Sequence, residues 1–143
     1  MLEETGKSMV LRRVAQEKKK ELKILGSKME KQGYISQLKS MVSELRQYEI
    51  TSEDLEEILQ DLEEKPELYY KLKDISVLYQ GFFDYLGEHF YTQEEVLDVL
   101  SQVADQSKKL KDCVLVLDGY TGFTPIQMRL LEKLVVLCEE VYV

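Results

Sequence analysis

The spacing of apolar residues predicts a mainly helical chain up to about residue 106. Apolar side chains recur every three or four residues in five segments, the spacing that places them on one face of an α-helix. The segments are residues 8–25, 34–48, 51–62, 66–86 and 92–103. Because residues 66–86 are apolar around much of the helix circumference, we expect this helix to be the central one of a bundle.

Several residues mark where these helices begin and end. Thr51 and Thr92 are each followed, three residues later, by an acidic side chain, which is the pattern of a helix-capping box. Pro66 suits the first turn of a helix, where its missing N–H does no harm. Gly26 and Gly87 are expected to end the helices that precede them.

The pattern changes after residue 109. Residues 113–117 form a short, valine-rich apolar run, which predicts a strand buried on both faces, as in a parallel sheet covered by helices. A helix capped at Thr124 and running to about residue 137 follows, and then the beginning of a second strand at 141–143. These strands cannot complete a sheet. We therefore expect the remaining strands to lie elsewhere in a longer protein; the alternative is a second chain.

The charge of the chain is distributed unevenly. The formal net charge is −8, but residues 1–48 carry 11 Lys or Arg against 6 Asp or Glu (+5), residues 49–100 carry 3 against 15 (−12), and residues 101–143 carry 5 against 6 (−1). Proteins that coat nucleic acid are normally basic throughout, so any contact with DNA must be local. The candidate contact patch for DNA or a partner consists of Arg12, Arg13, Lys18, Lys19, Lys20 and Lys23. No aromatic residue stands beside it in the sequence to stack on bases.

The sequence contains few residues that could bind a metal or take part in redox chemistry. Cys113 and Cys138 are too few for a metal cluster, and we expect both to be small buried side chains in a reducing cytoplasm. His89 is the only histidine, expected in a loop, which excludes a Cys/His metal set. The acidic residues of 53–61 are expected to form a solvated helix face. Residues 5–8 (Thr-Gly-Lys-Ser) lack the first glycine and the preceding strand of a phosphate loop.

Targeting signals are absent from the sequence. No apolar run reaches the roughly 18 residues of a membrane span. The N-terminal residues are acidic and lack the apolar region of a secretory signal. We therefore expect a cytoplasmic protein that makes no contact with a membrane.

The strongest chemical signal follows the predicted strand 113–117. Asp118 stands at its carboxyl end, ahead of a loop and a capped helix. In P-loop motors an aspartate at this place binds Mg²⁺, and the glutamate after it activates the attacking water. Here the next residue is Gly119. The alternative interpretation is a simple Asp-Gly turn, because both residues tolerate unusual backbone angles.

The wider segment resembles the second motor motif of UvrD-like superfamily 1 helicases, in which Asp-Glu-aromatic-Gln-Asp leads to a Pro and, two residues on, a Gln. The matching residues are Asp118, Tyr120, Pro125 and Gln127. Gly119 replaces the catalytic glutamate, and Thr121 and Gly122 replace the Gln and Asp. The departures affect the catalytic positions and spare the architectural ones, as in a motor fold that has lost its ATPase function.

The longer stretch DGYTGFTPIQMRLLEKL, from Asp118 on, is similar to the AddB (RexB) family, the B subunits of the bacterial ATP-dependent helicase/deoxyribonuclease AddAB. Residues 6–14, 33–35 and 44–45 also resemble this family. The resemblance implies that residues 1–110 are a helical-bundle insertion of an inactive helicase-like motor. Residues 111–143 would be a strand–helix–strand piece of its P-loop α/β core, with a degenerate nucleotide-binding motif.

The resemblance also implies a function. The parent complex would be an ATP-dependent helicase and exodeoxyribonuclease in double-strand break end processing and recombinational repair. Its partner would be an AddA-type helicase–nuclease subunit in a heterodimer, and its substrate double-stranded or unwound DNA. Mg²⁺ and ATP would serve the complex, and a 4Fe–4S cluster would lie outside this segment, which is expected to have no catalytic residue or metal. The alternatives are a free-standing helical adaptor that binds proteins through its acidic middle, and a small P-loop enzyme.

Overall fold

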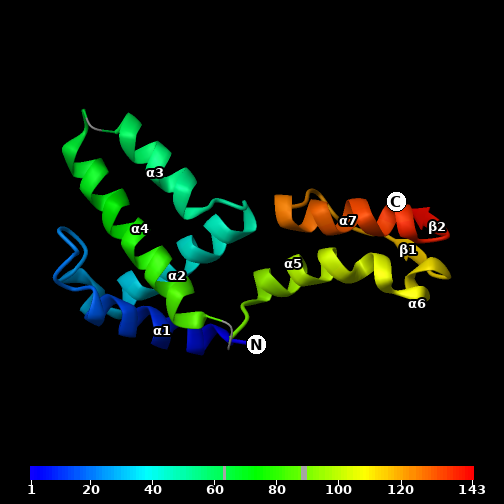
Figure 1. The fold of residues 1–143 in the computed structure, drawn as a ribbon, viewed down its shortest axis with the longest axis horizontal. Coiled ribbons are helices and arrows are strands. Elements are labelled where there is room, and N and C mark those ends of the chain that lie inside the picture. The colour runs from blue at the N-terminus through cyan, green and yellow to red at the C-terminus, as the bar shows by residue number, and fades with distance from the viewer. Residues whose placement is uncertain (63, 88–89) are drawn as a thin grey trace. The chain divides into compact units, whose positions relative to one another are not determined.

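The structure, a computed structural model, describes residues 1–62, 64–87 and 90–143 (Figure 1). The elements in these ranges are mainly helices, with two short strands near the C-terminus, so the mainly helical prediction is confirmed. None of the helices in the described ranges is both long and apolar enough to cross a membrane. The loop predicted around His89 lies outside the described residues.

The chain divides into two compact units, residues 1–46 with 50–91, and residues 47–49 with 92–143. This boundary differs from the predicted segments 1–110 and 111–143, because helix α5 (Gln93–Val103) packs against α7 (Pro125–Leu137) and joins the second unit. The assignment of the predicted segments to a helical insertion and a motor fragment stays a prediction.

Within the described residues, the first unit has four helices around one apolar core. They are α1 (Glu4–Glu17), α2 (Gln32–Gln47), α3 (Ser52–Asp61) and α4 (Pro66–Leu86), and a 3₁₀ turn η1 (Lys28–Glu30) precedes α2. Helix α4 packs against both α1 and α3, as Figure 1 shows. Its Leu78, Phe82 and Leu86 are at most 1% exposed, which confirms that it is the central helix.

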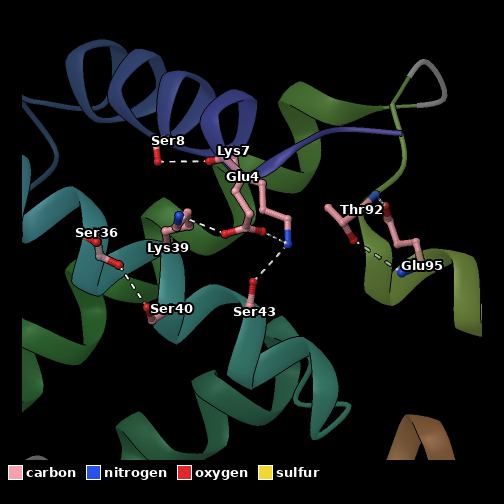
Figure 2. A network of polar contacts seen from close by, with 9 residues as sticks. All are labelled: Glu4, Lys7, Ser8, Ser36, Lys39, Ser40, Ser43, Thr92 and Glu95. Carbon is pink, nitrogen blue, oxygen red and sulfur yellow. Dashed lines mark hydrogen bonds and ion pairs between the residues drawn. The ribbon is translucent and has the colours of Figure 1, made fainter.

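Local signals set the ends of most helices as predicted. At the start of α3, Thr51 Oγ1 accepts the N–H of Asp54 (3.2 Å), and the Asp54 carboxylate accepts the N–H of Thr51 (2.7 Å). The latter bond lowers the pKa of the Asp54 carboxyl. Thr92 and Glu95 form the same reciprocal pair at the start of α5 (Figure 2). Helix α4 begins at the predicted proline and ends at the predicted glycine.

The predicted C-terminal end of the first helix is wrong, because α1 ends at Glu17 rather than near residue 25. The cause is a buried carboxylate on α4. Asp74, 1% exposed, accepts the backbone N–H groups of three consecutive residues. The donors are Lys23 (2.9 Å), Ile24 (2.7 Å) and Leu25 (2.7 Å).

A longer α1 would direct these three N–H groups to carbonyls four residues earlier. The carboxylate competes successfully because hydrogen bonds to an ionised acceptor are stronger than those to a carbonyl. The segment after α1 therefore folds back in turns onto α4. Two apolar residues of this segment, Leu22 and Leu25, are still buried, at 8% and 5% exposure.

The second unit contains the predicted strand–helix–strand. Its elements are α5, the 3₁₀ turn η2 (Ala104–Gln106), α6 (Lys108–Lys111), β1 (Val114–Val116), α7 and β2 (Glu140–Tyr142). The two strands are parallel, and Leu115 of β1 is opposite Val141 of β2. A strand beginning near residue 141 and a helix starting at Pro125 are thus confirmed.

The side chains of β1 are uncovered in this structure. Val114 and Val116 are 54% and 64% exposed, because the sheet has two strands in the described part of the chain. Burial of β1 by strands from elsewhere in a longer protein therefore stays a prediction. The prediction of two buried cysteines is wrong in this structure, since Cys113 beside β1 is exposed and Cys138 is half-buried.

Helix α5 packs against α7 with an unexpected face. Glu94 and Ser101 are buried, whereas Val99 and Val103 are 46% and 42% exposed. Salt bridges accompany this packing: Arg129 Nη2 of α7 lies 2.6 Å from a carboxylate oxygen of Asp98 and 2.6 Å from one of Glu49, and Lys133 Nζ lies 3.3 Å from Asp105 Oδ2. The second unit therefore keeps much of its apolar surface on the outside.

Replacing Asp74 by alanine should lower the free energy of unfolding by about 2–4 kcal/mol, because three N–H groups lose a charged acceptor. Urea unfolding followed by circular dichroism measures this change. Asp84→Ala is the matched control: it lies exposed on the same helix, accepts one hydrogen bond from Gln80 (2.7 Å), and should cost less than about 1 kcal/mol. Equal stability of the two variants would contradict the role given to Asp74.

Gly81→Ala should destabilise the protein although alanine favours helices. A Cβ at position 81 would lie 2.7 Å from Cγ1 of Val14 on α1, so the two helices would have to separate. We expect a loss of about 1–3 kcal/mol in urea unfolding, the usual range for overpacking. The double variant Val14→Ala/Gly81→Ala removes the clash and should be more stable than the sum of the two single changes; strict additivity would argue against the clash.

Candidate functional site

The residues of the predicted motor motif lie in the loop between β1 and α7 and at the start of α7. The N–H of Leu117 donates to the carbonyl oxygen of Tyr142 (2.9 Å), which extends the parallel pairing by one residue beyond β1. Asp118 follows directly, with an exposed side chain. The structure thus places this acid at the carboxyl end of a parallel strand, the place where open α/β sheets carry their ligand-binding groups.

Gly119 has a structural reason to be glycine. Its φ of +73° lies in the left-handed region, which costs a residue with a Cβ roughly 1–2 kcal/mol. No heavy atom lies within 4 Å of a Cβ built at this position, so the cost comes from the backbone angle alone. A glutamate at position 119 would therefore strain the backbone of this loop.

The other motif residues have local structural roles. The ring of Tyr120 stacks on that of Phe123, with centroids 4.9 Å apart and planes 24° apart. Gln127 Oε1 accepts the N–H of Thr124 (3.0 Å) at the start of α7. The structure thus brings Asp118, Gly119 and Tyr120 together in one loop and uses Gln127 to cap the helix that follows.

The residues of this chain do not by themselves fit an Mg·ATP site. Among the described residues, no group of three or more His, Cys, Asp or Glu side chains is arranged to hold a metal ion. Asp118 offers one carboxylate, and Gly119 adds none where a water-activating acid would stand. Cys113 and Cys138 are free thiols.

The Thr-Gly-Lys-Ser stretch at residues 5–8 lies inside helix α1 and not in a loop. Lys7 is 3% exposed: its Nζ lies 3.2 Å from Oε1 of Glu4 and donates to Oγ of Ser43 (3.2 Å). Lys39 Nζ lies 2.9 Å from Oε2 of Glu4 and lowers the pKa of that carboxyl (Figure 2). Lys7 thus belongs to a polar network that joins α1 to α2.

The predicted basic patch is partly neutralised by its own neighbours. Three of its members lie in ion pairs, at 2.6 Å for Arg13 with Glu17, 3.1 Å for Lys18 with Glu21 and 2.7 Å for Lys19 with Glu30. Exposed pairs of this kind add little stability, but they reduce the positive charge that a phosphate would meet. Arg12 and Lys20 are exposed, with no ion pair among the described residues.

No aromatic residue is adjacent to this patch in the sequence, but one lies beside it in the folded structure. Lys23 Nζ lies 4.7 Å from the centroid of the Tyr70 ring, which belongs to α4. Sequence reasoning missed this neighbour because the two residues are distant along the chain. The adjacent tyrosines Tyr69 and Tyr70, followed by Lys71 and Lys73, were the signal available in the sequence.

These features define a mainly helical chain whose second unit contains a parallel strand–helix–strand, with one acid, Asp118, in the loop after the first strand. A family model described as "ADDB, N-terminal" matches residues 1–143. The chain therefore belongs to the AddB N-terminal family.

Similar proteins agree with this assignment. The B subunit of the ATP-dependent helicase/deoxyribonuclease of Lachnoclostridium phytofermentans is 41% identical over 134 residues, 94% of this chain and 12% of that protein. The proteins of the same name from Alkaliphilus metalliredigens and Desulforamulus reducens are 35% and 31% identical over 93% and 99% of this chain. The chain spans 12% of the length of each of these relatives.

Gly119→Ala should lower the free energy of unfolding by about 1 kcal/mol through the left-handed backbone angle, and Gly119→Asn by less, because asparagine tolerates this region. Thermal unfolding of the three proteins measures the difference. Gly122→Ala is the matched control, since Gly122 lies in the same loop without a positive φ, and a Cβ added there would meet no atom within 4 Å. Equal losses at positions 119 and 122 would rule out the backbone explanation.

Proposed function

We propose that this chain is a non-catalytic segment of a helicase–nuclease subunit acting in double-strand break end processing and recombinational repair. Its role would be structural, in the path of the DNA or in contact with another subunit. The parent would pair with an AddA-type helicase–nuclease subunit in the cytoplasm and act on double-stranded or unwound DNA. Mg²⁺ and ATP would serve the complex, and an iron–sulfur cluster would belong to other parts of the parent protein.

One observation carries the non-catalytic part of the proposal. Asp118 ends a parallel strand, as the magnesium-binding acid of a motor does, but Gly119 follows with a backbone angle that disfavours any residue with a Cβ. This backbone angle disfavours a water-activating glutamate at position 119, which supports a non-catalytic role. The name that the relatives share, as B subunits of a helicase/deoxyribonuclease, supports the parent complex.

The segment roles follow from the same comparison. Residues 1–110 would be a helical insertion and residues 111–143 a degenerate piece of the motor core. The exposed valines of β1 support this assignment, because a parallel strand of this composition is normally covered on both faces. A free-standing adaptor would instead need the strand enclosed within its own sheet.

The proposal predicts that the protein binds no Mg·ATP, so isothermal titration should show no saturable heat. In the complex of the whole subunit with its partner, Asp118→Ala should leave the rates of ATP hydrolysis and DNA degradation unchanged within about twofold. Thermal unfolding of the variant provides the folding control. A loss of roughly a hundredfold, the scale of removing a transition-state contact, would show that Asp118 serves catalysis and would overturn the proposal.

A further inference from the structure

Three tyrosine rings of the first unit each lie close to a lysine ammonium. The distances from Nζ to the ring centroid are 4.7 Å for Lys23 and Tyr70, 5.7 Å for Lys73 and Tyr69, and 6.0 Å for Lys28 and Tyr34. Each ring is half-buried and each of these lysines is exposed. A half-buried ring loses little conformational entropy when a ligand stacks on its open part.

The pairs belong to one surface. The rings of Tyr69 and Tyr70 are in edge contact, with centroids 5.3 Å apart. Tyr34 and Lys71, the residue after Tyr70, both line a hollow of about 100 Å³ that Leu25 also borders. We call Lys23, Lys28, Lys71, Lys73, Tyr34, Tyr69 and Tyr70 the lysine–tyrosine surface.

Asp74 positions the Lys23–Tyr70 pair of this surface. It holds the backbone N–H of Lys23 at 2.9 Å, and it lies one helical turn after Tyr70 on α4. The backbone of Lys23 is therefore hydrogen-bonded to α4, the helix that carries Tyr70. A surface that is already ordered in the free protein binds without the entropic cost of forming it.

The charge of the surface is available to a ligand. Among the residues that the structure describes, its four lysines have no carboxylate within ion-pair distance, unlike Arg13, Lys18 and Lys19 of the predicted patch. Contacts between an ammonium and an exposed ring are worth only about 0.5–1 kcal/mol, so the lysines can turn to an anion. Two nearby carboxylates oppose this: Glu56 lines a hollow together with Tyr69 and Lys73, and Glu67 lines another together with Lys71.

We infer that the lysine–tyrosine surface binds single-stranded nucleic acid, with bases stacked on the tyrosines and phosphates paired with the lysines. Stacking on aromatic rings combined with cationic groups along the backbone is the chemistry by which proteins bind single strands without sequence preference. The inference rests on the proposed function, which brings this unit close to unwound DNA.

Fluorescence anisotropy with a labelled oligothymidylate of about 20 nucleotides tests the inference, since sites of this kind cover about 4–16 nucleotides. Tyr70→Ala should weaken binding roughly tenfold through the loss of one stacked base, whereas Tyr70→Phe keeps the ring face and should bind as the parent does. Glu56→Gln should strengthen binding. Tyr48→Ala is the matched control, an exposed tyrosine outside this surface that should change nothing.

Salt dependence gives a second readout that does not depend on the tyrosines. Four lysines that neutralise four phosphates predict a slope of about −3 in a plot of log affinity against log salt, and Lys23→Ala should make it shallower by about 0.7. Circular dichroism verifies that each variant is folded. Equal affinity of Tyr70→Ala and Tyr48→Ala, or an unchanged slope for Lys23→Ala, would overturn the inference.

An acidic protein partner is the competing class of ligand. Binding of a polyglutamate peptide that Lys23→Ala weakens, without binding of oligothymidylate, would assign the surface to such a partner and overturn the inference. The proposed function would survive that result if Mg·ATP gives no heat and the Asp118→Ala complex stays active. Conversely, saturable Mg·ATP binding would contradict the proposed function but would leave the measured binding of oligothymidylate as it is.

Discussion

A single buried carboxylate determines the arrangement of the first unit. Burying a charge is unfavourable unless strong hydrogen bonds replace its water, and Asp74 has three from consecutive backbone N–H groups. These bonds end α1 early and fold the following segment onto α4. They also place Leu22 and Leu25 in the core and Lys23 against Tyr70. The packing of this segment in the core and the Lys23–Tyr70 pair of the lysine–tyrosine surface therefore depend on one side chain.

The second unit is stabilised by different means. It has a small core in which Ile126 is 1% exposed, and its helix α5 begins at a capping box. Ion pairs of Arg129 and Lys133 on α7 contact α5 and its neighbours, while valines of α5 and β1 remain on the outside. Apolar surface of this extent is typical of protein that packs against further protein. This agrees with a segment whose role is structural.

The loop after β1 has the local architecture of the predicted motor motif, but a glycine follows its acid. The parallel strand, the acid at its end, the stacked aromatic pair and the capped helix form a complete local structure, yet the position after the acid has a glycine with φ +73°. One fold can carry sites of different chemistry, so the local architecture does not by itself define a catalytic site. In this chain, the groups suited to ligands lie instead on the lysine–tyrosine surface of the first unit.

The sequence by itself determined the features that depend on near neighbours: the capping boxes of α3 and α5, both ends of α4, and the strand–helix–strand. These follow from contacts over at most a few residues. The tertiary structure alone decided where α1 ends, which aromatic ring faces Lys23 and how much of β1 is exposed. The reason is physical: Asp74 and the N–H groups it accepts are 49 to 51 positions apart, and no local pattern marks which distant donors a carboxylate will meet.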